Sequence, residues 1–148
     1  MKHGIFLISI VTPALILGQS AYGAENAEHS RLIEDRIERF KTNKTAMRVI
    51  TQSFMDNDFR AIENAAQTIE DWAMEMASYF PLNSNGSPSQ ANDAIWQNPD
   101  RFQLLIKENV TAARQLKDLS IAENSADLPA AIRTLSHTCK ACHDQFRN

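Results

Sequence analysis

Both cysteines of the 148-residue chain lie in one five-residue string near its C-terminus, Cys139-Lys140-Ala141-Cys142-His143. Side chains three and four positions apart share one face of a helix, so both thiols and the imidazole can address one flat ligand. The C-x-x-C-H spacing is the attachment signature of a c-type haem, in which the thiols form thioethers and the histidine binds iron. The string therefore predicts one covalently bound haem c, held by Cys139, Cys142 and His143.

Other uses of paired cysteines fit this chain less well. A thiol–disulfide oxidoreductase places its C-x-x-C motif at a βαβ element, and the sequence shows no strand pattern. A zinc site needs four ligands in a tetrahedral array, whereas three ligands crowded onto one helical turn cannot converge. A purely structural pair, packed or disulfide-bonded, is the remaining alternative. No Ser–His–Asp arrangement, phosphate loop or paired-carboxylate cleft is evident, so we predict that the protein is not an enzyme.

The N-terminus has the layout of a secretory signal peptide. Lys2 precedes an apolar run from Ile5 to Leu17, and Ala21-Tyr22-Gly23 places small residues at the −3 and −1 positions of a cleavage site. The run is too short to span a bilayer comfortably, although an uncleaved anchor is the alternative. We predict a signal peptide at residues 1–23 and one mature domain at residues 24–148. The expected location is the periplasm, with no membrane span after cleavage, because bacteria attach haem c outside the cytoplasmic membrane.

The charge balance restricts the class of partner. The chain has 15 Lys and Arg against 18 Asp and Glu, a formal net charge of −3. This acidic balance argues against nucleic acid as a partner and is compatible with a basic redox partner. The mixed charges of Glu34-Asp35-Arg36 and Glu38-Arg39 predict a solvated helix face.

The mature chain reads as helix almost throughout. Apolar residues recur at helical spacing, and Gly86 is the only glycine after the signal segment. Met76 continues one apolar stripe and is interpreted as a core residue. We predict helices at about 28–54, 58–80, 99–119 and from Asn124-Ser125 to Phe146, with a loop at 82–99. Four amphipathic helices with one long connection predict an all-α, antiparallel four-helix bundle.

A C-x-x-C-H string on the last helix of such a bundle resembles the cytochrome c′ family. Three weaker matches support the resemblance over essentially the whole mature chain: Phe146-Arg147 after the motif, Phe80-Pro81 at the end of the second helix, and Ile95-Trp96 in the following loop. The resemblance implies thioethers at Cys139 and Cys142 and His143 as the proximal iron ligand. It also places Arg147 near that histidine and Met47 over the distal face of the iron.

The family divides at the distal position, and so does the expected function. A low-spin branch ligates iron with a methionine there, and His–Met ligation suits electron transfer. Most members leave the iron five-coordinate and high-spin, open to nitric oxide and carbon monoxide. We therefore expect a one-electron carrier with His143 and Met47 as axial ligands and a redox partner that the sequence does not identify. A gas-binding protein is the alternative, with Met47 simply a core residue.

This chain departs from the family one turn before Met47. The family usually has an arginine there that can meet a haem propionate, whereas this chain has Asn43. Lys44 and Arg48 are the candidate substitutes. A homodimer through the first two helices is expected by analogy with other family members.

Overall fold

A computed structural model describes residues 17–148, with side chains from residue 27 onward. The elements are α1 (Leu17–Asp56), α2 (Phe59–Glu75), the 3₁₀ helix η1 (Met76–Tyr79), α3 (Ala94–Gln97), α4 (Pro99–Ile121) and α5 (Leu128–Phe146). These residues include no strand, and only an isolated bridge joins Ala91 to Arg147. The all-α prediction is confirmed.

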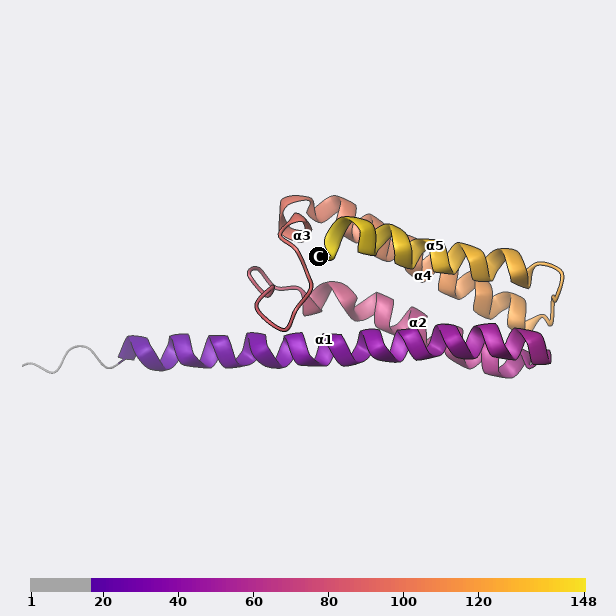
Figure 1. Ribbon diagram of the computed structural model, residues 1–148, viewed down its shortest axis with the longest axis horizontal. Coiled ribbons are helices and arrows are strands. Elements are labelled where there is room, and N and C mark those ends of the chain that lie inside the picture. Colours follow the sequence, from indigo (N-terminus) through magenta and orange to yellow (C-terminus); the bar gives the residue numbers. More distant parts are fainter. Residues whose placement is uncertain (1–16) are drawn as a thin grey trace, which may run out of the picture.

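The four long helices form two antiparallel pairs, α1 with α2 and α4 with α5, and α2 packs extensively against α4 (Figure 1). The long connection from α2 to α4 folds over one end of the bundle and includes α3. By contrast, α1 and α5 touch each other little. The predicted four-helix bundle is therefore confirmed, and the side between α1 and α5 is its least closely packed side.

The helix boundaries follow from local chemistry. Asp58 caps α2, since its Oδ1 accepts a hydrogen bond of 3.0 Å from the amide of Ala61. Pro99 occupies the start of α4, where its missing N–H is not needed. The second helix is predicted to extend to Phe80, whereas in the structure its last turn tightens into η1 ahead of Pro81.

The first helix begins earlier than predicted, at Leu17 instead of residue 28, and its N-terminal part projects beyond the bundle (Figure 1). The predicted signal peptide at 1–23 lies largely outside the described residues, and its cleavage stays a prediction. Within the described part of the chain, no helix has both the length and the apolar character that crossing a membrane requires.

Two apolar clusters make up the core. One lies among α1, α2, α4 and α5 and includes the fully buried residues Ile50, Leu116 and Leu135. The other is aromatic and lies at the end covered by α3, where Trp72 and Phe102 are buried. Met76 belongs to this second cluster, as predicted, and is 6% exposed. Burying apolar surface on both sides of α2 and α4 fixes the pairing of the helices.

A buried carboxylate joins α2 to α4. Glu70 is 3% exposed, and its two oxygens accept hydrogen bonds from Arg114 Nε at 2.7 Å and Lys117 Nζ at 2.5 Å. Burial alone would raise the pKa of Glu70, but the hydrogen bonds and charges of these two residues outweigh burial and lower its pKa below 4.5. The group is therefore charged in the folded protein.

Replacing Glu70 with alanine is expected to lower the free energy of unfolding by about 2–4 kcal/mol, because Lys117 then loses its carboxylate partner in a mostly buried position. Urea denaturation measures the change. The double variant Glu70→Leu/Lys117→Leu removes both charges and should recover most of the loss. Because the pKa is lower in the folded state, this stabilisation is present above about pH 4.5 and disappears as the pH falls further. Equal stability of Glu70→Ala and the parent protein would contradict the assignment.

Candidate functional site

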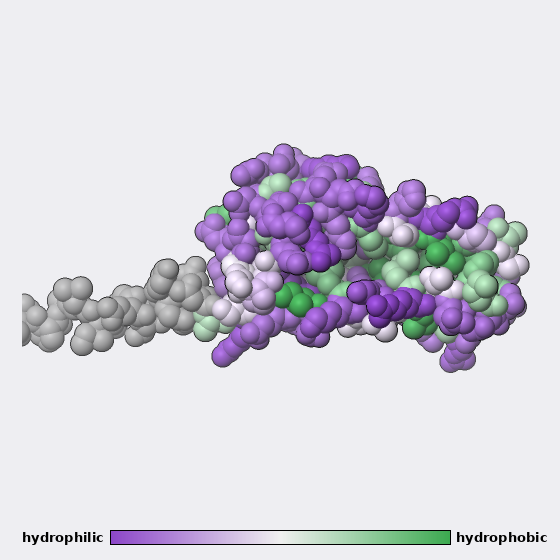
Figure 2. All heavy atoms as spheres, in the orientation of Figure 1, coloured by the Kyte–Doolittle hydropathy of each residue, from purple (hydrophilic) through white to green (hydrophobic). Residues whose placement is uncertain are grey.

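A cavity of about 640 Å³ lies between α1 and α5, within the size range of small-molecule and cofactor sites. In Figure 2 it is a pale and green hollow between hydrophilic ridges. Members of both core clusters form its floor, so the cavity lies where the two clusters meet. Its wall is lined by Phe40, Asn43, Lys44, Met47, Arg48, Thr51 and Gln52 of α1, Ile69 of α2, Met76 of η1, Leu105, Ile106 and Asn109 of α4, and Thr138, Cys139, Cys142, His143 and Arg147 at α5.

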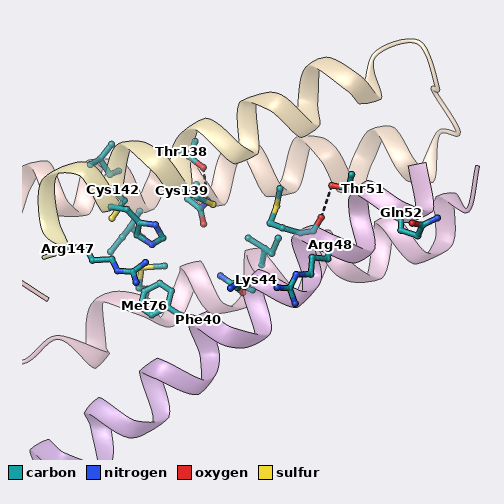
Figure 3. Close-up of a pocket in the computed structure, with 17 residues that line it drawn as sticks. Phe40, Lys44, Arg48, Thr51, Gln52, Met76, Thr138, Cys139, Cys142 and Arg147 are labelled. Carbon is teal, nitrogen blue, oxygen red and sulfur yellow. Dashed lines mark hydrogen bonds between the residues drawn. The ribbon is translucent and has the colours of Figure 1, made fainter. Parts of the chain in front are cut away.

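The α5 wall presents both thiols, and Figure 3 shows Cys139 and Cys142 across the cavity from Lys44 and Arg48 of α1. No disulfide joins the two cysteines. Asn109 Nδ2 donates to Thr138 Oγ1 at 2.7 Å and lies 3.8 Å from Cys139 Sγ, which holds that side of the wall in place.

The two thiols are protonated at neutral pH. Burial raises the pKa of Cys139 above its usual value, against hydrogen bonds from Thr138 and Asn109 that favour the thiolate. Burial, and then the neighbouring Cys139, raise the pKa of Cys142 to about 11. The wall therefore offers two neutral S–H groups, and neither is an activated thiolate.

His143 lies one position beyond Cys142 and lines the same cavity. Partial burial lowers the pKa of this imidazole below 6.5, and the positive charge of Arg147 lowers it further. The edge of the Phe40 ring meets the imidazole with the ring centres 6.2 Å apart. The imidazole is thus neutral near pH 7, the form that binds a metal ion.

The opposite wall, from α1, contains Met47 and Asn43. Met47 is partly buried and packs against the first core cluster while it lines the cavity. One turn earlier, the Oδ1 atom of Asn43 is buried and accepts no hydrogen bond from the described residues. The fold thus brings Met47 and His143, 96 positions apart in the sequence, to one cavity.

The cavity is rich in positive charge. Among the described residues, its charged lining residues are Lys44, Arg48 and Arg147, and none is Asp or Glu. A second cavity of about 600 Å³ shares His143 and Arg147 with the first and adds Arg36 and Lys41, and its described lining also contains no carboxylate. Apolar walls, two thiols, a neutral imidazole and a cationic rim fit a flat macrocycle that carries two propionate groups.

Arg36 was predicted on a solvated face, and that prediction is wrong: the residue is 2% exposed. Its guanidinium donates to Tyr79 O at 2.9 Å, Ser84 Oγ at 2.8 Å and Ser89 Oγ at 2.5 Å, and also to the Ser84 carbonyl. It also lies 4.4 Å over the centre of the Phe80 ring. Burial lowers its pKa to about 10, which leaves it charged at neutral pH.

The spacing of Arg36 was the available signal. It lies three positions after Ile33 and four before Phe40, which places it on the same face as the apolar stripe. The prediction of a solvated face rested instead on the charged residues that surround Arg36 in the sequence.

Comparison with known proteins identifies the family to which this fold belongs. The family model for cytochrome C′ matches residues 31–147. The chain belongs to the cytochrome c′ family. A relative, cytochrome c-556 of Agrobacterium tumefaciens, is 32% identical over 69% of this chain and 82% of its own length. The solved cytochrome c′ of Rhodopseudomonas palustris superposes with a TM-score of 0.70 at 25% identity, covering 79% of this chain and 95% of that one.

Some matches within the family are shorter. The cytochromes c′ of Rhodospirillum rubrum and Pararhodospirillum photometricum are 29% and 28% identical over 55% of this chain, and the matches span 56% and 66% of those proteins. Members of the cytochrome c′ family are covalent haem c proteins, so the predicted cofactor is confirmed. The chain is therefore a haem c protein of the cytochrome c′ family.

Proposed function

We propose that this cytochrome is a periplasmic one-electron carrier whose haem is attached through Cys139 and Cys142 and ligated by His143 and Met47. The observation that supports this most is the presence of Met47 and His143 on the α1 and α5 walls of one cavity. A thioether in the sixth position closes the site to exogenous ligands and raises the reduction potential, which suits electron transfer.

The residues of the cavity have distinct roles in this proposal. Each thiol would hold the haem as a thioether: its sulfur would bond one carbon of a vinyl group and its hydrogen the other, so no oxidant would be consumed. Asn109 and Thr138 hold the Cys139 side of the wall. The neutral imidazole of His143 is available to iron without first losing a proton. When bound, the haem supplies a single Fe(III)/Fe(II) couple.

Lys44, Arg48 and Arg147 favour the negatively charged propionates at the rim of the cavity. Arg147 is held at the end of α5 because its Nε donates to Gln90 Oε1 at 2.7 Å. Apolar residues of the floor, such as Leu105 and Ile106, keep water from the buried side of the macrocycle.

The alternative is a five-coordinate protein that binds nitric oxide or carbon monoxide, with Met47 as a steric gate. A structural relative, a mutant of cytochrome c prime from Alcaligenes xylosoxidans, was solved as its nitric oxide complex, with a TM-score of 0.72 and 18% identity. Another solved cytochrome c′ is described as having a ligand-controlled dimer dissociation. That description supports a homodimer as a further element of the proposal.

The two methionines of the cavity provide a matched test. We expect the oxidised parent protein to be low-spin, with a sulfur-to-iron charge-transfer band in its optical spectrum. Met47→Leu should lose the band and become high-spin, whereas Met76→Leu should keep it, because Met76 lies in the core cluster on the η1 side. A high-spin parent spectrum that does not change in Met47→Leu would favour the gas-binding alternative.

A further inference from the structure

Charge is unevenly distributed along this acidic chain. Residues 39–55, the part of α1 that lines the site, contain four basic residues and no Asp or Glu. The remaining sequence contains 11 basic and 18 acidic residues. Across the cavity, residues 128–148 add three basic residues and one acidic residue. Both sides of the cavity are therefore positive on a protein whose net charge is negative.

Three of these cations are available at the mouth of the cavity. Lys44, Arg48 and Arg147 are exposed, line the cavity and make no ion pair with any residue of the described chain. We call these three residues the basic rim, and Figure 3 shows their side chains at the edge of the cavity. The neighbouring Lys41 and Lys140 differ, because each pairs with a carboxylate of its own helix, Glu38 and Asp144.

Two propionates would offset only part of this charge. Of the seven basic residues in the facing segments, residues 39–55 and 128–148, three form ion pairs with carboxylates and four form none within the described chain. These four exceed the two negative charges that the propionates add. A cleft lined by one sign of charge focuses the field at its opening and governs the approach of charged molecules.

We propose that the basic rim is the docking surface for an acidic redox partner, a protein that presents carboxylates to the open edge of the cavity. This inference rests on the proposed electron-transfer function. It differs from the basic partner with which the net charge is compatible. At short range, an approaching partner experiences the local field of the cavity more strongly than the charge of the whole molecule. Lys44 and Arg48 lie one helical turn apart and pair with no described residue, so the positive charge that the propionates leave uncompensated suits adjacent carboxylates on such a partner.

The direction in which the rate of electron transfer to a charged oxidant changes with ionic strength tests the proposal. The haem-loaded, reduced protein is mixed in a stopped-flow instrument with ferricyanide, an anion that accepts one electron and becomes ferrocyanide. Net charge predicts repulsion and rates that rise with ionic strength. The basic rim predicts attraction, and a rate that falls about three-fold or more between roughly 10 and 300 mM ionic strength. The cationic oxidant tris(phenanthroline)cobalt(III) should show the opposite slope.

Charge reversal locates the effect. Lys44→Glu/Arg48→Glu should slow the reduction of ferricyanide at low ionic strength by about five-fold or more. The rate for this variant should then rise with ionic strength instead of falling. Arg60→Glu/Lys107→Glu changes the net charge equally, at exposed residues outside both cavities, and should leave the slope unchanged. If the glutamate variant fails to bind haem, Lys44→Gln/Arg48→Gln replaces it and should flatten the slope.

A polyanion distinguishes a protein-like partner from other anionic surfaces. Poly-L-glutamate should protect the reduced parent protein from ferricyanide, and poly-L-lysine should not. Ferricyanide rates that rise with salt, or protection by phosphatidylglycerol vesicles and not by poly-L-glutamate, would overturn the proposal. The optical test at Met47 is independent of these measurements, so failure of the docking surface and failure of the electron-transfer function are distinguishable.

Discussion

Alanine at both Cys139 and Cys142 is expected to abolish covalent haem on a denaturing gel. Each thioether needs one thiol, and these are the only two cysteines of the chain. Both thiols line the cavity on the same face of α5 as His143, so no other described side chain can replace them. Haem-dependent peroxidase staining should fall at least about ten-fold relative to total protein, because denaturation releases a macrocycle held only by its axial ligands.

Single replacements test the two thioether bonds one at a time. Cys139→Ala and Cys142→Ala should each keep one thioether and therefore retain haem on the gel. Thr138→Ala is the matched control, since it alters the neighbouring residue on α5 and the contact with Asn109 but no attachment point. Haem that stays attached in the double variant would show that attachment does not depend on these thiols.

The sequence predicted the features that depend on periodic spacing of apolar residues or on a short continuous motif. Apolar residues at helical spacing predicted the four long helices, and the string from Cys139 to His143 predicted one wall of the site. Met47 was predicted through the family resemblance, not through a local pattern. The structure places it on the same cavity as His143, while its bond to iron stays a prediction.

Contacts between distant segments could not be predicted in this way. The loop after η1 is held to the end of α5 by hydrogen bonds such as Asn92 N to Phe146 O at 3.1 Å. No spacing rule relates residues more than fifty positions apart, because their meeting depends on how the helices pack. The net charge likewise could not predict the cationic character of the cavity, because it sums over all faces of the protein.

Arg36 shows how position can outweigh residue type. A buried guanidinium loses much of its hydration, and here no carboxylate among the described residues compensates it. Its partners are instead two carbonyls and two hydroxyls from Tyr79, Ser84 and Ser89. One side chain of α1 thus satisfies four acceptors of the connection that covers the second cavity.

Replacing Arg36 with methionine is expected to lower the free energy of unfolding by about 2–4 kcal/mol, because burial then leaves those acceptors without donors. Lysine should recover little of this loss, since an ammonium group cannot reproduce the planar fork of donors that spans four acceptors. Urea denaturation of the haem-loaded protein measures both changes, and limited proteolysis should show faster cleavage between residues 82 and 93.

Arg39→Met is the matched control on the same helix. Arg39 pairs with Asp35 and Glu75, but its side chain is 36% exposed, so its loss should cost under about 1 kcal/mol. The comparison separates two opposing terms at Arg36, the cost of burying a charge and the gain from four hydrogen bonds. An Arg36→Met variant as stable as the parent protein would mean that the two terms cancel. Slow proteolysis of the loop in that variant would further show that apolar packing alone holds the connection over the cavity.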